Sequence, residues 1–203
     1  LFNGISKMDL SRRKGLVREA VEENRDRLEG IARYLYENPE LGSEEEKAAE
    51  RLTEELEKAD FTVEREIAGI STAFKATYNS DERGARVAVI AEYDALPGVG
   101  HGCGHNLIAA SAIGAVIAAS RAMEGLKGEI MVVGTPAEEG HGRYAGSKAI
   151  LAEKSFWDDI DAAIMLHPST SWGVGNQSLG IWSIKMEFKG QTSHAAVDPH
   201  RGV

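Results

Sequence analysis

Cysteine is almost absent from this sequence of 203 residues, which contains only Cys103. A single cysteine cannot form an internal disulfide bond, so the cysteine content does not indicate an oxidising compartment. Residues 1–15, LFNGISKMDLSRRKG, also lack the continuous apolar segment of a signal peptide. We therefore expect a cytoplasmic protein.

Long apolar runs and an excess of positive charge are lacking as well. The most apolar stretch, residues 107–123, is rich in alanine and slightly short for a membrane span, so a buried helix explains it better. Lys and Arg number 23 against 32 Asp and Glu, which gives a formal net charge of −9. Nucleic acids and anionic membranes are polyanions, so this charge argues against both as partners. The apolar fraction of 42% is typical of a soluble globular protein.

The apolar periodicity predicts helices first and alternating strands and helices afterwards. A helical pattern covers residues 16–35, and a second helix is predicted to begin at Ser43, which would form a capping box with Glu46. The alternating segments FTVEREI and STAFKATYN are typical of two strands joined by a turn. Buried strands are then predicted in RVAVIAEYDA, EIMVVGTPAEE and DAAIMLHP, with helices at 107–123 and in SKAILAEKSFW between them.

This order of elements predicts an α/β fold with a mixed, mostly parallel sheet flanked by helices. After Pro168 the composition shifts to Ser, Gly and Asn, and a new alternating strand, residues 181–189, does not fit another strand–helix unit. We therefore predict one domain over residues 1–178 and the incomplete beginning of a smaller α+β domain over residues 179–203.

Side chains of metal-ligand type follow each of the three predicted buried strands. Ligands in open α/β sheets bind at the carboxyl ends of strands, so these side chains are expected at one edge of the sheet. Thiolate, imidazole and carboxylate groups are all metal ligands, which predicts a metal site there. The residues are Glu92, Asp94, Cys103 and His105 after the first strand, Glu138 and Glu139 after the second, and His167 after the third.

Each of these groups also has an ordinary structural explanation. A lone cysteine is usually a small buried hydrophobic residue, and nearby histidines are commonly surface or hydrogen-bonded residues. A pair of adjacent glutamates is usually solvated. A metal site explains the pattern better because three separate strand ends bring ligand types to the same edge.

Glu138 and Glu139 are expected to point in different directions, as neighbouring residues at a strand end do. One carboxylate can then bind metal while the other stays free. A free carboxylate beside a metal-bound water is the arrangement for metal-assisted hydrolysis, because the cation lowers the pKa of the water and the carboxylate accepts its proton. The same carboxyl group can pass that proton to a leaving amine.

Five motifs occur along the chain in the order NPELGSEE, EYDALPGVGHGCGHN, GTPAEEG, LHP and GQTSHAAVDPHRG. In this order they resemble the M20 metallopeptidase and amidohydrolase family, and within it the branch with a Cys-Gly-His loop. The form EYDALPG followed by CGHNL is similar to the aminobenzoyl-glutamate hydrolase and M20-domain dipeptidase subgroup. The resemblance covers nearly the whole chain.

The resemblance implies a catalytic domain of the zinc-peptidase type that binds two divalent metal ions, zinc or manganese, with nickel or cobalt as alternatives. Glu138 matches the general base of the family, and Asp94 matches a carboxylate that supports the metal site. Glu92 stands where other relatives carry a ligand histidine, and we do not assign it to the metal. The implied metal ligands are Cys103, His105, Glu139 and His167.

His194 lies in the SHA motif, and the resemblance implies that it reaches the active site of a partner subunit and stabilises the oxyanion of the tetrahedral intermediate. The implied assembly is a homodimer formed through the second domain. The alternative explanation is an ordinary surface histidine in a loop.

The implied activity is hydrolysis of an amide bond in N-acyl amino acids, aminobenzoyl-glutamate-like compounds or dipeptides. Family members are longer and carry a last histidine ligand beyond the region matched here, so we expect a fragment or a truncated form. The alternative function is a non-catalytic metal- or small-molecule-binding module. The intact Glu138–Glu139 pair favours the enzyme, because a binding module has no use for a free base. A structural zinc site is disfavoured, since such sites usually close with four Cys or His ligands.

Overall fold

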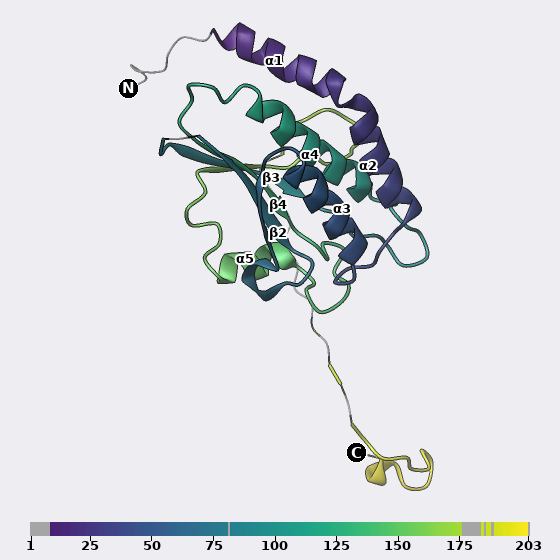
Figure 1. Ribbon diagram of the computed structural model, residues 1–203. Coiled ribbons are helices and arrows are strands. Elements are labelled where there is room, and N and C mark those ends of the chain that lie inside the picture. Colours follow the sequence, from purple (N-terminus) through teal and green to yellow (C-terminus); the bar gives the residue numbers. More distant parts are fainter. Residues whose placement is uncertain (1–8, 81, 176–183, 185, 188, 203) are drawn as a thin grey trace. The chain divides into compact units, whose positions relative to one another are not determined.

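The computed structural model describes residues 9–80, 82–175, 184, 186–187 and 189–202. The chain divides into two compact units, Leu1–Pro168 and Ser169–Val203. The first unit contains the sheet and the α-helices, and the second contains the short 3-10 helix η2 (Pro199–Arg201) (Figure 1). The strand predicted over residues 181–189 lies mostly outside the described residues.

Within the described residues, five strands form one mixed sheet in the order β1-β2-β4-β3-β5. Figure 1 labels its three central strands, β2, β4 and β3. β3 pairs in parallel with β4 and β5, whereas β2 pairs antiparallel with β1 and β4. The carboxyl ends of β3, β4 and β5 therefore lie at the same edge, and the predicted mixed sheet is confirmed. The strands are β1 (Thr62–Arg65), β2 (Phe74–Asn79), β3 (Ala85–Ala91), β4 (Gly128–Gly134) and β5 (Ala162–Ile164).

Helices cover both faces of this sheet, as β4 shows. Successive side chains of a strand point to opposite faces. Val132 packs in one hydrophobic cluster with residues of α2, α3 and α4, whereas Met131 and Val133 pack in a second cluster with Leu151 of α5. The helices are α1 (Leu10–Glu23), α2 (Arg25–Glu37), α3 (Glu46–Glu57), α4 (His105–Ser120) and α5 (Ser147–Glu153).

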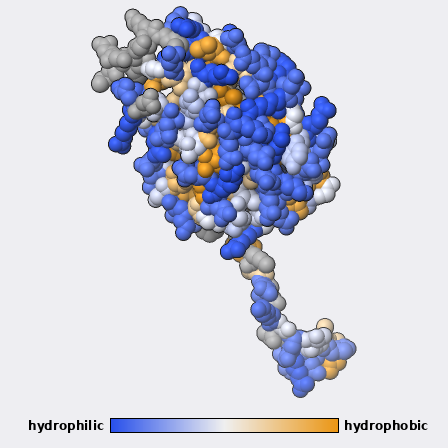
Figure 2. Space-filling view, viewed as in Figure 1, coloured by the Kyte–Doolittle hydropathy of each residue, from blue (hydrophilic) through white to orange (hydrophobic). Residues whose placement is uncertain are grey.

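The apolar run after β3 forms the buried helix that the sequence predicts. Ile108, Ile113 and Val116 of α4 are almost fully buried. None of the helices in the described part of the chain combines the length and hydropathy needed to span a bilayer. Hydrophilic residues dominate the face of the first unit shown in Figure 2, with apolar residues in small patches between them.

Three details of the predicted elements are wrong. The helix predicted over residues 16–35 is two helices, because the chain leaves helical geometry at Asn24, whose side-chain amide donates to the carbonyl of Ala20 (2.8 Å). An asparagine side chain of this kind competes with the helical hydrogen bonds. The last predicted strand was expected to be buried, but β5 is an exposed edge strand of three residues that pairs with β3.

The capping box at Ser43 is also absent, because α3 begins at Glu46 and Ser43 has a positive φ of 72°. The carboxylate of Glu40 instead accepts hydrogen bonds from the backbone N–H groups of Lys47 (3.2 Å) and Ala48 (2.8 Å). Glu40 therefore caps the first turn of α3. The hydroxyl of Ser43 accepts from the N–H of Tyr144 (2.8 Å), which ties this loop to the segment after β4.

Candidate metal centre

The predicted ligands of the first unit gather beyond the carboxyl ends of β3, β4 and β5. His105 is the first residue of α4, and it follows Gly104, whose φ of +80° favours glycine. The other members follow strand ends: Glu92 and Asp94 after β3, Glu138 and Glu139 after β4, and His167 after β5.

His105 is the centre of this cluster and is only 1% exposed. Its Nδ1 lies 2.9 Å from Oδ1 of Asp94, which leaves Nε2 to face the other carboxylates. Burial lowers the pKa of His105, but the hydrogen bond and charge of Asp94 outweigh this effect and raise the pKa above its ordinary value. A carboxylate that fixes one imidazole nitrogen and leaves the other free is the usual support of a metal-binding histidine.

Three carboxylates surround Nε2 of His105 at similar distances. Oε2 of Glu92 lies 3.5 Å from this nitrogen, and Oε2 of Glu138 and Oε1 of Glu139 each lie 3.7 Å from it. Ligand atoms bound to one tetrahedral ion at about 2.1 Å lie about 3.4 Å from each other. The observed separations therefore match ligand atoms that share a cation.

Among the described residues, two groups of side chains could each hold a metal ion, and both include His105. One group consists of Glu92, His105 and His167, and the other of His105, Glu138 and Glu139, with one ligand atom of each residue within 4.8 Å of the others. Nε2 of His105 and Oε2 of Glu92 are buried and have no hydrogen-bond partner among the described residues. Buried polar atoms are nearly always partnered, so these two atoms fit a cation.

Cys103 lies beside this cluster on the loop between β3 and α4. A hydrogen bond with Glu139, together with burial and the nearby carboxylates, raises the pKa of its thiol to about 11. The two groups of ligand atoms do not include Cys103, which instead has Glu139 as its hydrogen-bond partner. A divalent cation here would favour the thiolate instead, because it is the largest local charge.

The two glutamates after β4 were expected to point in different directions, but both carboxylates approach Nε2 of His105 and differ mainly in exposure. The side chain of Glu139 is 17% exposed, and its backbone N–H donates to Oδ2 of Asp94 (2.9 Å). The side chain of Glu138 is 37% exposed. Burial and the charge of Glu92 raise the pKa of Glu138. The backbone before them is held by Glu45, a buried carboxylate whose Oε1 accepts from the N–H of Ala137 (2.7 Å).

The histidines of the two units are placed differently. His167 is exposed, its Nδ1 lies 2.9 Å from the carbonyl of Pro168, and its ring centroid lies 6.2 Å from that of His105. His194 belongs to the second unit, where its Nδ1 accepts from the N–H of Ala196 (3.2 Å). A role of His194 at the metal centre stays a prediction.

Sequence reasoning missed two residues around the candidate centre, Lys148 and Glu45. Lys148 of α5 forms an ion pair with Oε1 of Glu92, and its Nζ lies 4.0 Å from Oε1 of Glu138. Glu92 itself was expected at this edge of the sheet, because it directly follows a strand, but it was not assigned to the metal; it belongs to one of the two candidate groups.

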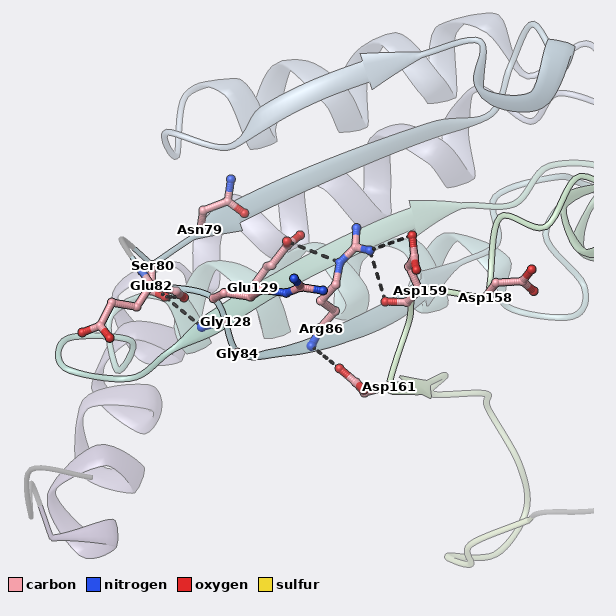
Figure 3. Close-up of a pocket in the computed structure, with 11 residues that line it drawn as sticks. Asn79, Ser80, Glu82, Gly84, Arg86, Gly128, Glu129, Asp158, Asp159 and Asp161 are labelled. Carbon is pink, nitrogen blue, oxygen red and sulfur yellow. Dashed lines mark hydrogen bonds and ion pairs between the residues drawn. The ribbon is translucent and has the colours of Figure 1, made fainter. Parts of the chain in front are cut away.

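A separate hollow of about 610 Å³ lies at the opposite, amino end of β3 and β4 (Figure 3). Its charged side chains bond mainly to each other: Arg86 pairs with Glu129 (3.3 Å) and Asp159 (3.5 Å), and its backbone N–H donates to Asp161 (2.8 Å). None of these residues belongs to a candidate metal group. The hollow is therefore separate from the candidate centre.

The fold and the site define an α/β protein with a candidate metal centre at the carboxyl edge of a mixed sheet. The sequence profile of Peptidase family M20/M25/M40 matches residues 88–202, which is more than half of the chain. The chain therefore belongs to this peptidase family.

Individual relatives agree with the resemblance seen in the motifs. One subunit of the p-aminobenzoyl-glutamate hydrolase of Escherichia coli is 35% identical, over 91% of this chain and 41% of that protein. The Xaa-Arg dipeptidase of Mus musculus is 34% identical, over 91% of this chain and 45% of that protein. A dinuclear metal binding peptidase of the M20 family from Bacillus subtilis matches in structure with a TM-score of 0.62 at 26% identity, over 70% of this chain and 42% of that one. The chain thus spans less than half the length of these relatives.

Proposed function

We propose that this chain carries the metal-binding and proton-transferring residues of a metal-dependent amide hydrolase. The two relatives are named for p-aminobenzoyl-glutamate and for Xaa-Arg dipeptides, which are both amino acids acylated on nitrogen. We therefore propose N-acyl amino acids, aminobenzoyl-glutamate-like compounds or dipeptides as substrates. In each of them an amide bond joins an acyl group to the nitrogen of an amino acid.

The observation that carries this proposal is the different setting of Glu138 and Glu139. The backbone N–H of Glu139 donates to Asp94 (2.9 Å), and its carboxylate has the thiol of Cys103 as a hydrogen-bond partner. Both carboxylates lie 3.7 Å from Nε2 of His105, but Glu138 is more exposed, and its other charged contact is Lys148 at 4.0 Å. A more exposed carboxylate beside the proposed metal ligands is suited to general base catalysis.

We assign Cys103, His105, Glu139 and His167 as the residues that would hold two divalent ions. When bound, such ions lower the pKa of a water molecule and polarise the carbonyl group of the substrate. Glu138 then accepts the proton of the water on a carboxylate oxygen and donates it to the leaving amine. Asp94 keeps His105 oriented during these steps. Thiolate and imidazole ligands favour zinc, whereas the carboxylates also suit manganese.

We further propose that the second domain begins near residue 179 and forms a homodimer. In this assembly His194 would approach the site of the partner subunit and donate a hydrogen bond to the oxyanion. Such a donor acts where charge develops in the transition state, which makes its contribution to the rate large.

The test of this function is the Glu138→Gln variant. We expect zinc binding per chain equal to that of the parent, measured by elemental analysis after dialysis. Turnover of aminobenzoyl-glutamate, N-acetyl amino acids and dipeptides should fall by about 10²–10⁴-fold, because the general base is lost. Glu153→Gln, an exposed change at the end of α5, is the matched control and should keep full turnover.

Equal turnover in Glu138→Gln and the parent would contradict the assignment of the base. A parent protein that binds zinc and hydrolyses none of these compounds would instead support a non-catalytic metal-binding module.

A further inference from the structure

Glu92 has an environment that an ordinary structural carboxylate does not have. It directly follows β3, and its side chain is only 1% exposed. Oε2 is buried without a hydrogen-bond partner among the described residues, and it lies 3.5 Å from Nε2 of His105, which has no partner either. Leaving two buried polar atoms unpartnered is costly, so a further group is expected between them.

A third ligand completes this arrangement. One ligand atom each of Glu92, His105 and His167 lie within 4.8 Å of one another. The three residues come from three different segments, after β3, at the start of α4 and after β5. Two imidazoles and one carboxylate are a donor set that zinc and related divalent ions accept.

The other oxygen of Glu92 is held by Lys148. The Nζ of Lys148, on the first turn of α5, forms an ion pair with Oε1 of Glu92. The carbonyl oxygen of Lys148 also accepts a hydrogen bond from the indole N–H of Trp157 (3.1 Å), which fixes this turn of the helix. With Oε1 bound to Lys148, Oε2 is the oxygen that faces His105.

We propose that Glu92 is a metal ligand of this centre and that Lys148 positions it. This inference rests on the metal centre of the proposed function and adds a residue to its ligands. His105 has one free nitrogen, Nε2, so it can bind only one ion. The other ligands of that ion would be Oε2 of Glu92 and an imidazole nitrogen of His167. Glu139 and Cys103 remain for the second ion. The charge of Lys148 offsets one of the carboxylates that crowd the site.

A direct ion pair between Glu92 and a protonated His105 is the competing explanation. The separation of 3.5 Å is longer than the 2.7–3.2 Å of ordinary hydrogen bonds of this type. It matches the spacing of about 3.4 Å between two ligands of one tetrahedral ion. If Glu92 only formed an ion pair with His105, the zinc affinity of the centre would depend on the charge of Glu92 and not on the length of its side chain. If Glu92 binds the metal, the affinity depends on both.

Glu92→Asp separates these explanations, because it keeps the charge and shortens the side chain by one methylene. We expect its zinc affinity, measured by competition with a chromophoric chelator, to fall about 10–100-fold, together with that of Glu92→Gln. The visible absorption of the Co²⁺-substituted protein should change in both variants, since it reports the ligand set. Glu153→Asp is the control and should match the parent in both measurements.

Lys148→Met tests the positioning role. Its zinc affinity should fall, Lys148→Arg should restore most of the loss, and Glu92→Asp/Lys148→Met should bind zinc no more weakly than Glu92→Asp alone. Tighter zinc binding by Lys148→Met would show that Lys148 only repels the cation and would overturn the positioning role. Circular dichroism of each metal-free variant establishes that it is folded.

Glu92→Asp with parental zinc affinity and an unchanged Co²⁺ spectrum would overturn the ligand role of Glu92. The proposed function would survive that result if Glu138→Gln still lost turnover. A parent protein that binds no zinc would overturn both.

Discussion

Asp94 connects two residues of the candidate centre through a single carboxylate. Oδ1 accepts from Nδ1 of His105, and Oδ2 accepts from the backbone N–H of Glu139, each at 2.9 Å. Burial raises the pKa of Asp94, but these hydrogen bonds outweigh it and lower the pKa. The carboxylate form therefore fixes the imidazole of one proposed ligand and the backbone of another.

Asp94→Asn should weaken metal binding without unfolding the chain. An amide presents one oxygen and one NH₂ group, so it cannot accept both hydrogen bonds. We expect zinc affinity to fall about 10–100-fold, as is usual when a residue that orients a metal ligand is changed. Chelator competition measures this, with Asp26→Asn on the exposed face of α2 as the control. Unchanged affinity in Asp94→Asn would contradict the role of Asp94.

The residues of the candidate centre were only partly predictable from the sequence. Strand ends meet at one edge of a sheet, which led us to expect Glu92, Glu138, Glu139 and His167 near one another, and the structure places each of them near His105. That rule depends only on the order of the elements. The role of Lys148 could not be found in this way, because it depends on how α5 packs against the end of β3. The pairing of Glu45 with Ala137 likewise joins residues far apart in the chain.

Helices α2 and α3 are joined by a partly buried ionic cluster at Glu55. The Glu55 side chain is 5% exposed and pairs with Arg27 of α2, with Arg51 (3.2 Å) and with Lys58 (3.1 Å). Burial raises the pKa of Glu55, but the hydrogen bonds and charges of these partners outweigh it and lower the pKa. A carboxyl group whose pKa is lowered by folding stabilises the folded state in its ionised form.

Glu55→Gln should therefore destabilise the protein in a manner that depends on pH. We expect a loss of about 1–3 kcal/mol in the free energy of unfolding at pH 7. The contribution of Glu55 is present above its unfolded pKa and is lost as the pH falls through the lower folded pKa, so parent and variant should converge below about pH 4. Urea unfolding at several pH values measures this difference.

Glu54→Gln is the matched control for this prediction. Its partner Lys58 is 3.8 Å away and both side chains are about half exposed, so the loss should stay below about 1 kcal/mol. A difference between parent and Glu55→Gln that does not change with pH would contradict the lowered pKa.

The elements themselves were predicted well where burial determines the pattern. The apolar runs of β4 and α4 predicted largely buried elements, and both are largely buried, whereas in β3 only Ala88 and Ala91 are buried. The break between α1 and α2 was missed, because it depends on the bond between the Asn24 side chain and the carbonyl of Ala20. The start of α3 was missed because the hydroxyl of Ser43 accepts from the N–H of Tyr144, and Glu40 caps the helix instead. A capping pattern in the sequence cannot show that a distant N–H group competes for the same hydroxyl.

At the scale of the whole molecule, the two units contribute differently to the proposed chemistry. The hydrophobic clusters on the two faces of the sheet lie within the first unit, Leu1–Pro168. The two groups of candidate metal ligands found among the described residues also lie within this unit, since the last residue of either group is His167. The first unit therefore holds these hydrophobic clusters together with the candidate cation ligands of the described residues.

A chain that ends at Gly175 should fold and bind metal like the parent. We expect the same midpoint of thermal unfolding by circular dichroism and the same zinc affinity, because the core and the candidate ligands are retained.

His194→Ala in the chain of 203 residues should likewise keep zinc affinity, and under the proposed function it should lower turnover only. If the shortened chain loses zinc while His194→Ala keeps it, residues after 175 other than His194 support the centre. If both lose zinc, His194 binds the cation itself, and its assignment to the oxyanion is wrong.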